Sequence, residues 1–327
     1  MANTIGTQAA PGNTYSDPGI YYDRRFLERV KPQLYLMDMG DKKPLPTKSG
    51  TLIKWHRLNK LTAQTTPLTE NTNPSDQTVG TTPVSVEPLT YGSWVKVSAE
   101  LNLKSINPIV EEILDELGDQ AALTYDTLVF NALHGNFQNQ FAGGAVSEAA
   151  ITDASVFNAS ELRKAVYKLR KVTVNSVNAS VPGYEGNLYK AVIHPAQHYD
   201  IQSDSAVGSF IDVMKYSRPE DIMKGEVGQL YGARIVVSPN LATGTGASDV
   251  TYRAFLFGRQ AYGITELSGQ GIRTIRQPAG SNADPLEMFT TLGWKFMMAA
   301  KVLHNVRAVE IYTSLGATTD VIRLRGG

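Results

Sequence analysis

The run from Asn59 to Pro83 constrains this chain more than any other feature. Its 25 residues include eight Thr, three Asn and three Pro but only four apolar residues. Such a segment buries too little apolar area to offset the entropy of ordering it, so it builds no core of its own. Structureless loops of this length inside a compact domain are uncommon, and they are usually functional excursions or disordered segments. We expect this run to leave its own subunit and lie on another one.

Two β-rich stretches flank this run. Thr51 to Leu58 and Val84 to Glu100 contain Trp55 and Trp94 among alternating polar residues, which is typical of strands. They are predicted to be the two legs of one long hairpin whose tip is Asn59 to Pro83. With ~3.3 Å of rise per residue, a leg of about 18 residues reaches roughly 60 Å, more than the radius of a domain of this size.

The bulk composition limits the possible functions. The 327 residues, 42% of them hydrophobic, suffice for one large domain or two ordinary ones. The chain has 31 Lys and Arg residues and 31 Asp and Glu residues, so its formal net charge is zero. It therefore has no strong electrostatic field that would attract nucleic acid or a membrane. The absence of Cys excludes disulfides, thiolate catalysis and Cys-based zinc sites. With no apolar run of ~18 residues and no basic start, the chain is expected to stay in an aqueous cytoplasm unless something carries it out.

The first 40 residues suggest a docking element. Residues 1–19 are rich in Asn, Thr, Gly and Pro and are expected to form an extended arm. Tyr21 to Met39 has helical spacing of apolar residues that Pro32 interrupts, which predicts a short kinked helix.

The strongest helix prediction covers Pro108 to His134. Apolar residues recur there with a 3.6 period, Pro108 suits a first turn, and Gly135 supplies the stop. At 1.5 Å per residue these positions make a rod of about 40 Å. Its acidic residues, with no Lys or Arg among them, are Glu111, Glu112, Asp115, Glu116, Asp119 and Asp126.

A second helix is predicted from Ala159 to Val172. Asn158 is its expected N-cap, with Glu161 three residues later. Its apolar face is Leu162, Ala165, Val166 and Leu169, and its basic face is Arg163, Lys164, Lys168, Arg170 and Lys171. Two interpretations of the acidic and basic helices stay open: solvated faces of one domain, or pairing with each other or with a neighbouring subunit.

The second half of the chain contains short β-rich runs separated by turn residues, a pattern that predicts short strands. Pro195 closes a buried strand and begins a short helix through Tyr199, and Ala242 to Val250 is predicted to be a Gly/Thr/Ser loop. The predicted strands are Tyr189 to His194, Arg234 to Val237 and Phe255 to Gly258, followed by long alternating runs at Tyr262 to Thr274 and Met288 to Thr313.

No residue pattern predicts catalysis, a cofactor or a metal. His194 and His198 are four apart, but Pro195 places His194 at a strand end, so the two imidazoles are not expected to share a helical face. The acidic residues of the long helix share one environment, which gives no means of separating their pKa values. The sequence contains no G-x-S-x-G, P-loop or G-x-G-x-x-G motif.

The order of parts resembles the major capsid proteins of tailed bacteriophages. Those parts are the arm, the long hairpin, the one-sided helix, the strand ending in His194-Pro195, the Gly232-Ala-Arg-Ile-Val-Val-Ser-Pro unit and the returning strands. Gly225 to Leu241 and Gly293 to Thr313 carry the most recognisable stretches. The resemblance implies an α+β Johnson fold. Its implied parts are an N-terminal arm (1–45), an extended loop (46–103), a peripheral domain with the spine helix (104–180 and 266–318), an axial domain (181–265) and a C-terminal tail (319–327).

The resemblance also implies a function and partners. The chain is expected to self-assemble, as pentamers and hexamers, into the icosahedral shell around the double-stranded DNA of a tailed phage. Implied partners are a separate scaffolding protein, a portal, decoration proteins and packaged DNA touched without sequence specificity, and no membrane. The expected location is the virion capsid, and the host cytoplasm before assembly.

Two alternatives stay open. One is an encapsulin-type bacterial compartment of the same fold, which encloses a cargo enzyme instead of DNA. The other is an extracellular sugar-active enzyme, which requires carboxylates that converge in a cleft.

Overall fold

The computed structural model describes residue 26 and residues 34–48, 50–59, 61–68, 70, 73, 75–104, 109–174, 177–204, 226–247, 250–269, 271–277 and 286–315. Its contacts divide the chain into two compact units. The first comprises Met1–Leu34, Leu89–Thr124 and Gly269–Met297, and the second Tyr35–Pro88, Tyr125–Ser268 and Met298–Gly327. The arm predicted at residues 1–19 lies outside the described residues. Of the kinked helix predicted after it, Phe26 is helical, whereas residues 35–39 form turns.

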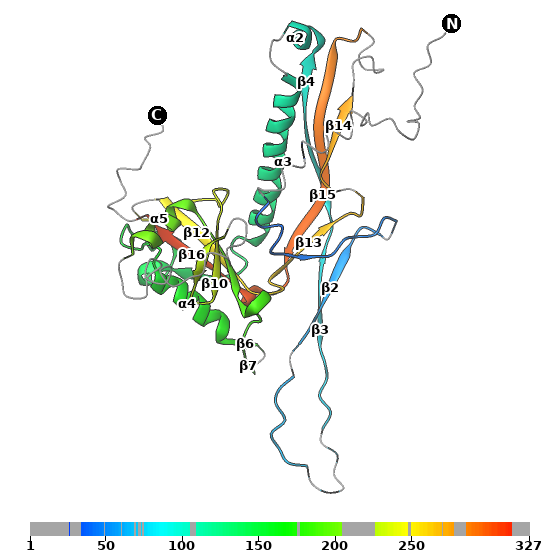
Figure 1. The fold of residues 1–327 in the computed structure, drawn as a ribbon. Helices are drawn as coiled ribbons and strands as arrows, with labels where there is room; N and C mark the ends of the chain where they lie inside the picture. The colour runs from blue at the N-terminus through cyan, green and yellow to red at the C-terminus, as the bar shows by residue number, and fades with distance from the viewer. Residues whose placement is uncertain are drawn as a thin grey trace. The chain divides into compact units, whose positions relative to one another are not determined.

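The first unit is a small sheet beside a helix (Figure 1). It contains β4 (Leu89–Ser98), α2 (Ala99–Lys104), β14 (Arg273–Gln277) and the first parts of α3 (Ile109–Leu133) and β15 (Phe289–Val302). β15 pairs with β4 and, antiparallel, with β14. Successive side chains of a strand face opposite sides, and Leu292, Trp294 and Phe296 form the buried face of β15. The Trp294 indole donates a hydrogen bond to Gln120 Oε1 of α3 at 3.0 Å, which fixes helix to sheet.

The long helix forms where its apolar period predicts it. α3 covers 25 residues, so its length is about 38 Å. Leu114, Leu117, Ala121 and Tyr125 are buried, as the period requires. Gly135 has a φ of 71°, a left-handed conformation that ends the helix at low cost because glycine has no Cβ. Pro108, the predicted first residue, lies outside the described residues.

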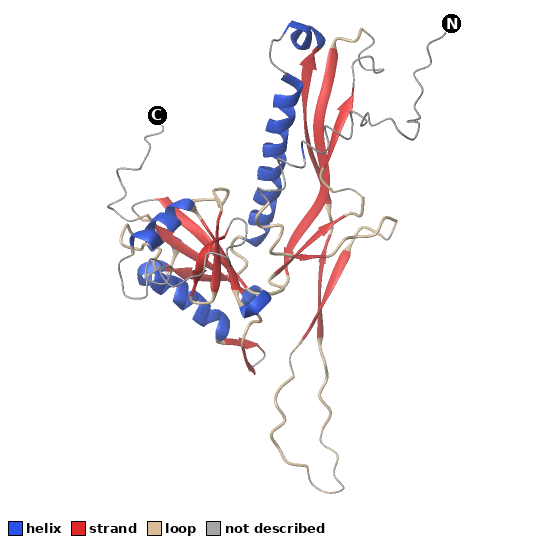
Figure 2. Cartoon of the chain, viewed as in Figure 1, coloured by secondary structure: helices blue, strands red, loops and turns tan. Residues whose placement is uncertain are grey.

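The second unit is built on a seven-stranded sheet (Figures 1 and 2). Its order is β5-β16-β12-β8-β10-β9, with β11 paired to β12. β5–β16 and β8–β10 are parallel pairs, and the other pairs are antiparallel. The strands are β5 (Gln138–Phe141), β8 (Tyr189–Ile193), β9 (Glu226–Leu230), β10 (Ala233–Val237), β11 (Gly244–Thr245), β12 (Val250–Phe257) and β16 (Ala308–Ser314).

Helices and aromatic rings bury this sheet. α4 (Ala159–Arg170) packs its predicted apolar face, Leu162, Ala165, Val166 and Leu169, against residues of β8, β10, β12 and β16. The Asn158 side chain accepts a hydrogen bond from Glu161 N at 2.9 Å, so the predicted N-cap is confirmed. Phe255 and Phe257 stack 5.5 Å apart and meet Phe130 and Phe137 edge-on. This aromatic cluster ties the end of α3 to the centre of the sheet.

Shorter elements complete the second unit. α5 (Pro195–Ser203) follows β8, and β1 (Asp41–Lys42) pairs in parallel with β13 (Tyr262–Glu266), which pairs with the later part of β15. A two-stranded sheet joins β2 (Ile53–Leu58) to β3 (Thr81–Val86), and another joins β6 (Val172–Val174) to β7 (Val177–Ala179). Four 3₁₀ turns are described, at Ala142–Gly144, Glu148–Ala150, Glu185–Asn187 and Asn305–Arg307.

Several sequence expectations are corrected by the structure. The second hairpin leg, predicted at 84–100, is two strands: β3 pairs with β2, whereas β4 pairs with β15 and α2 begins at Ala99. Pairing in the hairpin therefore covers six residues of each leg, about 20 Å. Val172 begins β6 instead of ending the second helix, and the predicted loop 242–250 contains β11. The runs 262–274 and 288–313 each divide into two strands, because turns interrupt their alternation.

None of the helices in the described ranges is long and apolar enough to span a membrane.

Candidate assembly surfaces

The hairpin tip has no core. β2 and β3 pair from Ile53↔Val86 to Leu58↔Thr81, and Asn59 N donates to Gly80 O at 2.9 Å beyond the last pair. Every described residue between 61 and 80 is exposed, and none belongs to a helix or strand (Figures 1 and 2). The composition of the segment predicts this arrangement, because it offers too few apolar side chains for packing.

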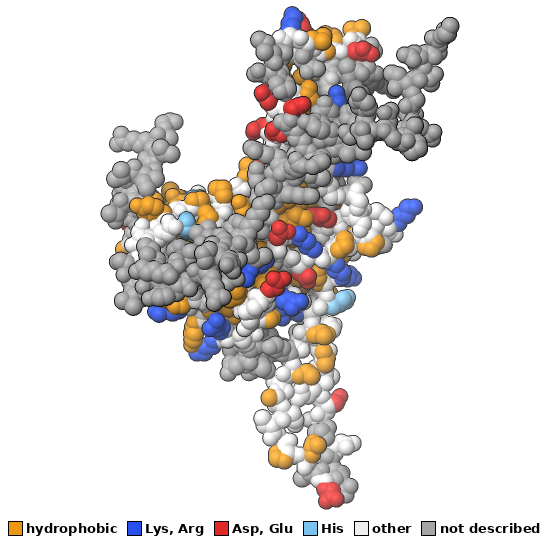
Figure 3. Space-filling model, in the orientation of Figure 1, with side chains coloured by type: hydrophobic (Ala, Val, Ile, Leu, Met, Phe, Trp, Pro, Cys, Tyr) orange, Lys and Arg blue, Asp and Glu red, His pale blue; other side chains and the backbone are white. Residues whose placement is uncertain are grey.

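The tip nevertheless carries groups that can bind another surface. Leu58, Leu61, Leu68 and Val79 are 66%, 49%, 74% and 54% exposed, respectively. The Gln77 side chain joins the two legs by donating to Thr62 O at 3.4 Å and to Gln64 Oε1 at 3.3 Å. Figure 3 shows this hairpin as a mostly polar surface with isolated apolar side chains. Such a surface stays soluble and still offers apolar contacts to a partner.

The hairpin base, in contrast, is held firmly in the second unit. Ile53 and Trp55 are 3% and 9% exposed and pack with Leu45 and Leu303. A Cβ at Gly263 would lie 2.8 Å from a Trp55 ring carbon, so only glycine lets the indole pack against β13 at this point. A fixed base thus presents an exposed tip, the usual arrangement for a binding loop on a scaffold.

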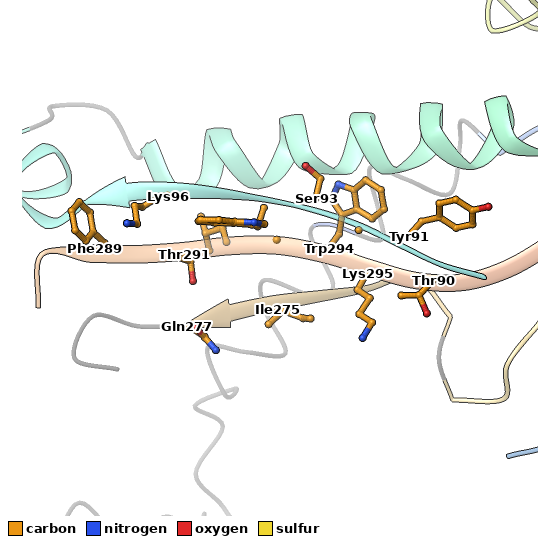
Figure 4. Close-up of a pocket in the computed structure, with 14 residues that line it drawn as sticks. Thr90, Tyr91, Ser93, Lys96, Ile275, Gln277, Phe289, Thr291, Trp294 and Lys295 are labelled. Atoms are coloured by element: carbon orange, nitrogen blue, oxygen red, sulfur yellow. The ribbon is translucent and has the colours of Figure 1, made fainter. Parts of the chain in front are cut away.

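A groove in the first unit is the second candidate surface (Figure 4). Its volume is about 540 Å³, and β4, β14 and β15 form it. Trp94 and Ile275 in its lining are 66% and 41% exposed. The lining residues are Thr90, Tyr91, Gly92, Ser93, Trp94, Lys96, Ile275, Gln277, Phe289, Thr291, Leu292, Gly293, Trp294 and Lys295. Exposed apolar area of this kind marks contact surfaces more often than catalytic sites.

Two glycines allow β4 and β15 to approach closely at the groove. A Cβ at Gly92 would lie 2.8 Å from Trp294 O, and one at Gly293 would lie 2.7 Å from Ser93 O. Both contacts are with backbone atoms, which cannot move aside without separating the strands. Nearby, Lys96 Nζ lies 3.9 Å from the centre of the Phe289 ring, a cation–π contact. The groove therefore combines exposed aromatic area with a small number of cations.

The acidic residues of α3 do not all lie on a solvated face. Glu112 and Glu116 are exposed, whereas Glu111, Asp115 and Asp119 are half-buried. The solvated-face interpretation is wrong for Asp126, which is 1% exposed in the second unit. Burial raises the pKa of Asp126 to about 7, although the Asn240 side chain and the backbone amides of Leu36 and Tyr35 favour its charged form.

His194 and His198 do not form a metal pair. His194 is the N-cap of α5, and its Nδ1 accepts a hydrogen bond from Ala196 N at 3.1 Å. His198 lies inside the helix, so the prediction that the two imidazoles share no helical face is confirmed. Across the described ranges, no three or more His, Asp or Glu side chains are placed to hold a metal ion.

The basic face of α4 finds partners in its own unit. Lys164 Nζ lies 2.7 Å from Glu161 Oε1, and Lys168 donates to Asn139 O at 3.2 Å. Arg163 lies 5.8 Å from the centre of the Tyr231 ring. Pairing of this face with the acidic helix or with a neighbouring subunit stays a prediction.

Sequence reasoning misses the groove and one internal ion pair. The Glu148 carboxylate accepts from Arg253 Nη2 at 2.9 Å and from Thr251 Oγ1 at 2.5 Å, across about a hundred residues of sequence. No local pattern signals such a distant pair. The groove has a weak signal, because β4 and β15 each carry aromatic residues in alternating runs, but their pairing with each other is not visible in the sequence.

Solved capsid structures share this architecture. The capsid of Ralstonia phage GP4 matches with a TM-score of 0.70 and 16% identity, over 85% of this chain and 87% of that one. The capsid asymmetric unit of cyanophage Pam1 matches with a TM-score of 0.63 and 13% identity, over 97% and 98% of the two chains. At these identities the likeness establishes the fold. The predicted α+β phage-capsid fold is therefore confirmed.

The encapsulin-type alternative is not better supported. A virus-like particle from Pyrococcus furiosus matches with a TM-score of 0.54 and 10% identity, over 90% of this chain and all of that one. This likeness again concerns the fold.

A family model decides the identity. No curated protein sequence gives a significant match. The family model described as phage capsid protein, however, matches residues 81–310, well over half of the 327 residues. The matched range begins at β3 and ends in β16, so it includes the spine helix, the groove strands and the seven-stranded sheet. The chain is therefore a structural protein of the virion shell and belongs to the phage capsid protein family.

Proposed function

We propose that copies of this chain form, as pentamers and hexamers, the icosahedral head of a tailed phage around double-stranded DNA, and that the hairpin tip joins neighbouring copies. One observation carries this proposal: a hairpin with a buried base ends in a tip whose described residues between 61 and 80 are all exposed. Such a tip gains buried area only on another surface. Because interfaces need bury only ~800 Å² per partner, several modest contacts per copy suffice to close a shell.

The groove of the first unit is the proposed receiving surface on a neighbouring copy. It exposes Trp94 and Ile275, and the tip exposes Leu61, Leu68 and Val79. An extended chain can place alternate apolar side chains on such a sheet surface while its polar backbone stays hydrated. The Thr and Gln side chains of the tip then form hydrogen bonds with polar groups at the rim of the groove.

The same proposal divides the chain into an arm, a loop, two domains and a tail. It assigns the arm to residues 1–45, the extended loop to 46–103, the peripheral domain to 104–180 and 266–318, the axial domain to 181–265 and the tail to 319–327. Proposed partners are a separate scaffolding protein, a portal, decoration proteins and packaged DNA, and assembly takes place in the host cytoplasm. The protein is proposed to have no enzymatic activity, which is supported by carboxylates that follow α3 in succession instead of converging in a cleft.

A deletion tests the role of the tip. Replacing residues 62–79 with a short Gly-Ser linker leaves β2, β3 and the hairpin base intact. We expect folded subunits that circular dichroism cannot distinguish from wild type and that form no closed shells in light scattering and electron microscopy. A matched control replaces only the side chains of Thr62, Thr65 and Thr66 with Ser, which keeps length and polarity. Normal particles from the deletion would refute the proposal.

A further inference from the structure

The hairpin base carries a cationic pocket that the proposed contacts do not use. Its volume is about 460 Å³, and it lies entirely in the second unit. Arg57 and Lys301 provide its charge, and Asn136 and Asn305 provide amides. Its remaining lining is apolar: Val84, Ala132, Val302 and Leu303. No carboxylate belongs to this lining.

A further cation, the Arg307 guanidinium, lies near this pocket beside His304, whose lowered pKa keeps it neutral at pH 7. Burial lowers the pKa of His304 to about 4, with added repulsion from Arg307 and Arg57. Burial also lowers the pKa of Arg307, and Arg57 contributes again. The described hydrogen bonds of these guanidinium groups go to neutral acceptors: Arg57 donates to Leu303 O at 3.4 Å, and Arg307 donates to Gln260 Oε1 at 2.8 Å. Within the described ranges, the positive charge of this pocket is not balanced by an ion pair.

The complementary charge lies on α3. Glu112 and Glu116 are exposed and one helical turn apart, on a helix without any Lys or Arg. Like charges at this spacing repel each other, and a cation placed between them relieves the repulsion. Their carboxylates are held on a rigid rod, so they can enter a pocket together.

Neither Glu112 nor Glu116 lines the cationic pocket of its own chain. Ala132, near the end of α3, lines the cationic pocket. Glu116 lies 16 residues earlier on the same continuous helix, which is about 24 Å at 1.5 Å per residue. No carboxylate is among the described residues that line the pocket, so the pocket is open to a carboxylate of another molecule.

We infer that Glu112 and Glu116 of one copy dock against Arg57 and Lys301 of a second copy. This inference rests on the proposed shell assembly, which brings many copies of the chain together. A second copy is the favoured partner because the chain itself carries the complementary groups, exposed Glu112 and Glu116 on one surface and Arg57 and Lys301 on another. Its 31 acidic and 31 basic residues also give it no net charge to attract a polyanion. Charge complementarity of this kind fixes the register between subunits and suppresses wrong pairings.

Charge reversal tests the docking in the full-length chain. R57E/K301E and E112K/E116K each place like charges at the contact, and the quadruple variant restores opposite charges with the signs exchanged. We expect each double variant to lower the yield of closed particles about tenfold or more, and the quadruple variant to recover most of it. Particle yield is measured by light scattering and electron microscopy, and folding by thermal melting.

Controls separate docking from general charge effects. E87K/E185K reverses two exposed carboxylates outside the proposed contact and changes the net charge as much as E112K/E116K does. This control should leave the particle yield unchanged. If a charge-reversed variant has a lower melting temperature than wild type, the double-mutant cycle is repeated with K301Q and E116Q. Both positions are exposed, and these substitutions remove a charge instead of reversing it.

Four outcomes decide against the docking. R57E/K301E shells that form normally overturn it, and so does a folded quadruple variant as defective as the doubles. R57E/K301E shells that form normally but lose their DNA assign the pocket to phosphate groups instead. A wild-type chain that forms no particles even together with its proposed scaffolding protein overturns the proposed function, and this docking with it.

Discussion

His134 Nδ1 lies 2.7 Å from Glu310 Oε1, at the point where the spine helix ends against the central sheet. Glu310 is fully buried in β16, and its second oxygen accepts a hydrogen bond from Gly135 N at 2.9 Å. The Glu310 carboxylate thus binds both residues that follow the last residue of α3. The contact fixes the last turn of α3 to β16 within the second unit.

Removing this carboxylate should destabilise the subunit strongly. Glu310→Ala leaves Gly135 N and His134 without their buried acceptor, and we expect the free energy of unfolding to fall by about 2–3 kcal/mol. Glu310→Gln keeps one acceptor oxygen and should cost roughly half as much. Urea unfolding followed by circular dichroism measures both. Equal and small losses for the two variants would show that the contact contributes little.

Asp126 predicts a pH dependence with a definite sign. Its pKa is raised from 3.8 to about 7, so the folded state carries no penalty below pH ~4, loses stability as the pH rises from ~4 to ~7, and keeps the full loss above ~7. Asp126→Asn removes the buried charge and should stabilise the protein at pH 8 by about 2–4 kcal/mol. At pH 4 the two proteins should melt within a few degrees of each other. Thermal unfolding across this range checks the prediction, and a constant difference between the proteins at all pH values would contradict it.

Two tryptophans of the first unit should separate stability from assembly. Trp294 is 4% exposed and bonded to Gln120, so Trp294→Ala should destabilise the fold by about 3–5 kcal/mol. Trp94 is 66% exposed in the groove, so Trp94→Ala should change stability by less than about 0.5 kcal/mol and still reduce particle yield. Melting curves and electron microscopy on the same preparations distinguish the two effects. A Trp94→Ala chain that assembles like wild type would remove the groove from the proposed contacts.

The N-cap of α4 gives a smaller, local prediction. Asn158→Ala removes the acceptor of Glu161 N and should cost about 1 kcal/mol, whereas Asn158→Asp should be nearly neutral because it keeps that acceptor. Denaturant titration resolves a difference of this size. Indistinguishable midpoints for Ala and wild type would mean that the cap is not needed once the apolar face of α4 has packed.

Local signals predict much of the fold from the sequence. The apolar period places α3 within one residue of its observed ends, and Asn158 marks the start of α4. The polar run at 59–83 predicts a tip without a core, which is correct for the described residues between 61 and 80, whereas residues 81–83 belong to β3. These features depend on residues close in sequence, so propensity and periodicity suffice to find them.

Long-range pairing could not be predicted. β4 continues the β-rich run of β3 almost without interruption, yet it pairs with β15, about 200 residues later. The choice between those partners depends on tertiary packing around Gly92 and Gly293, which the alternation of one strand does not encode. The burial of Asp126 escapes prediction for the same reason, because its position in the helix alone does not show what covers it.

The exposed tip has a consequence for how such a protein changes over time. Because the described tip residues between 61 and 80 are exposed, substitutions at Leu61 or Leu68 leave subunit folding nearly unaffected. Selection reaches these positions only through the neighbour that they touch. The tip and its receiving surface can therefore change together during evolution. Subunits of two related lineages can then fold alike and still be unable to assemble into one mixed shell.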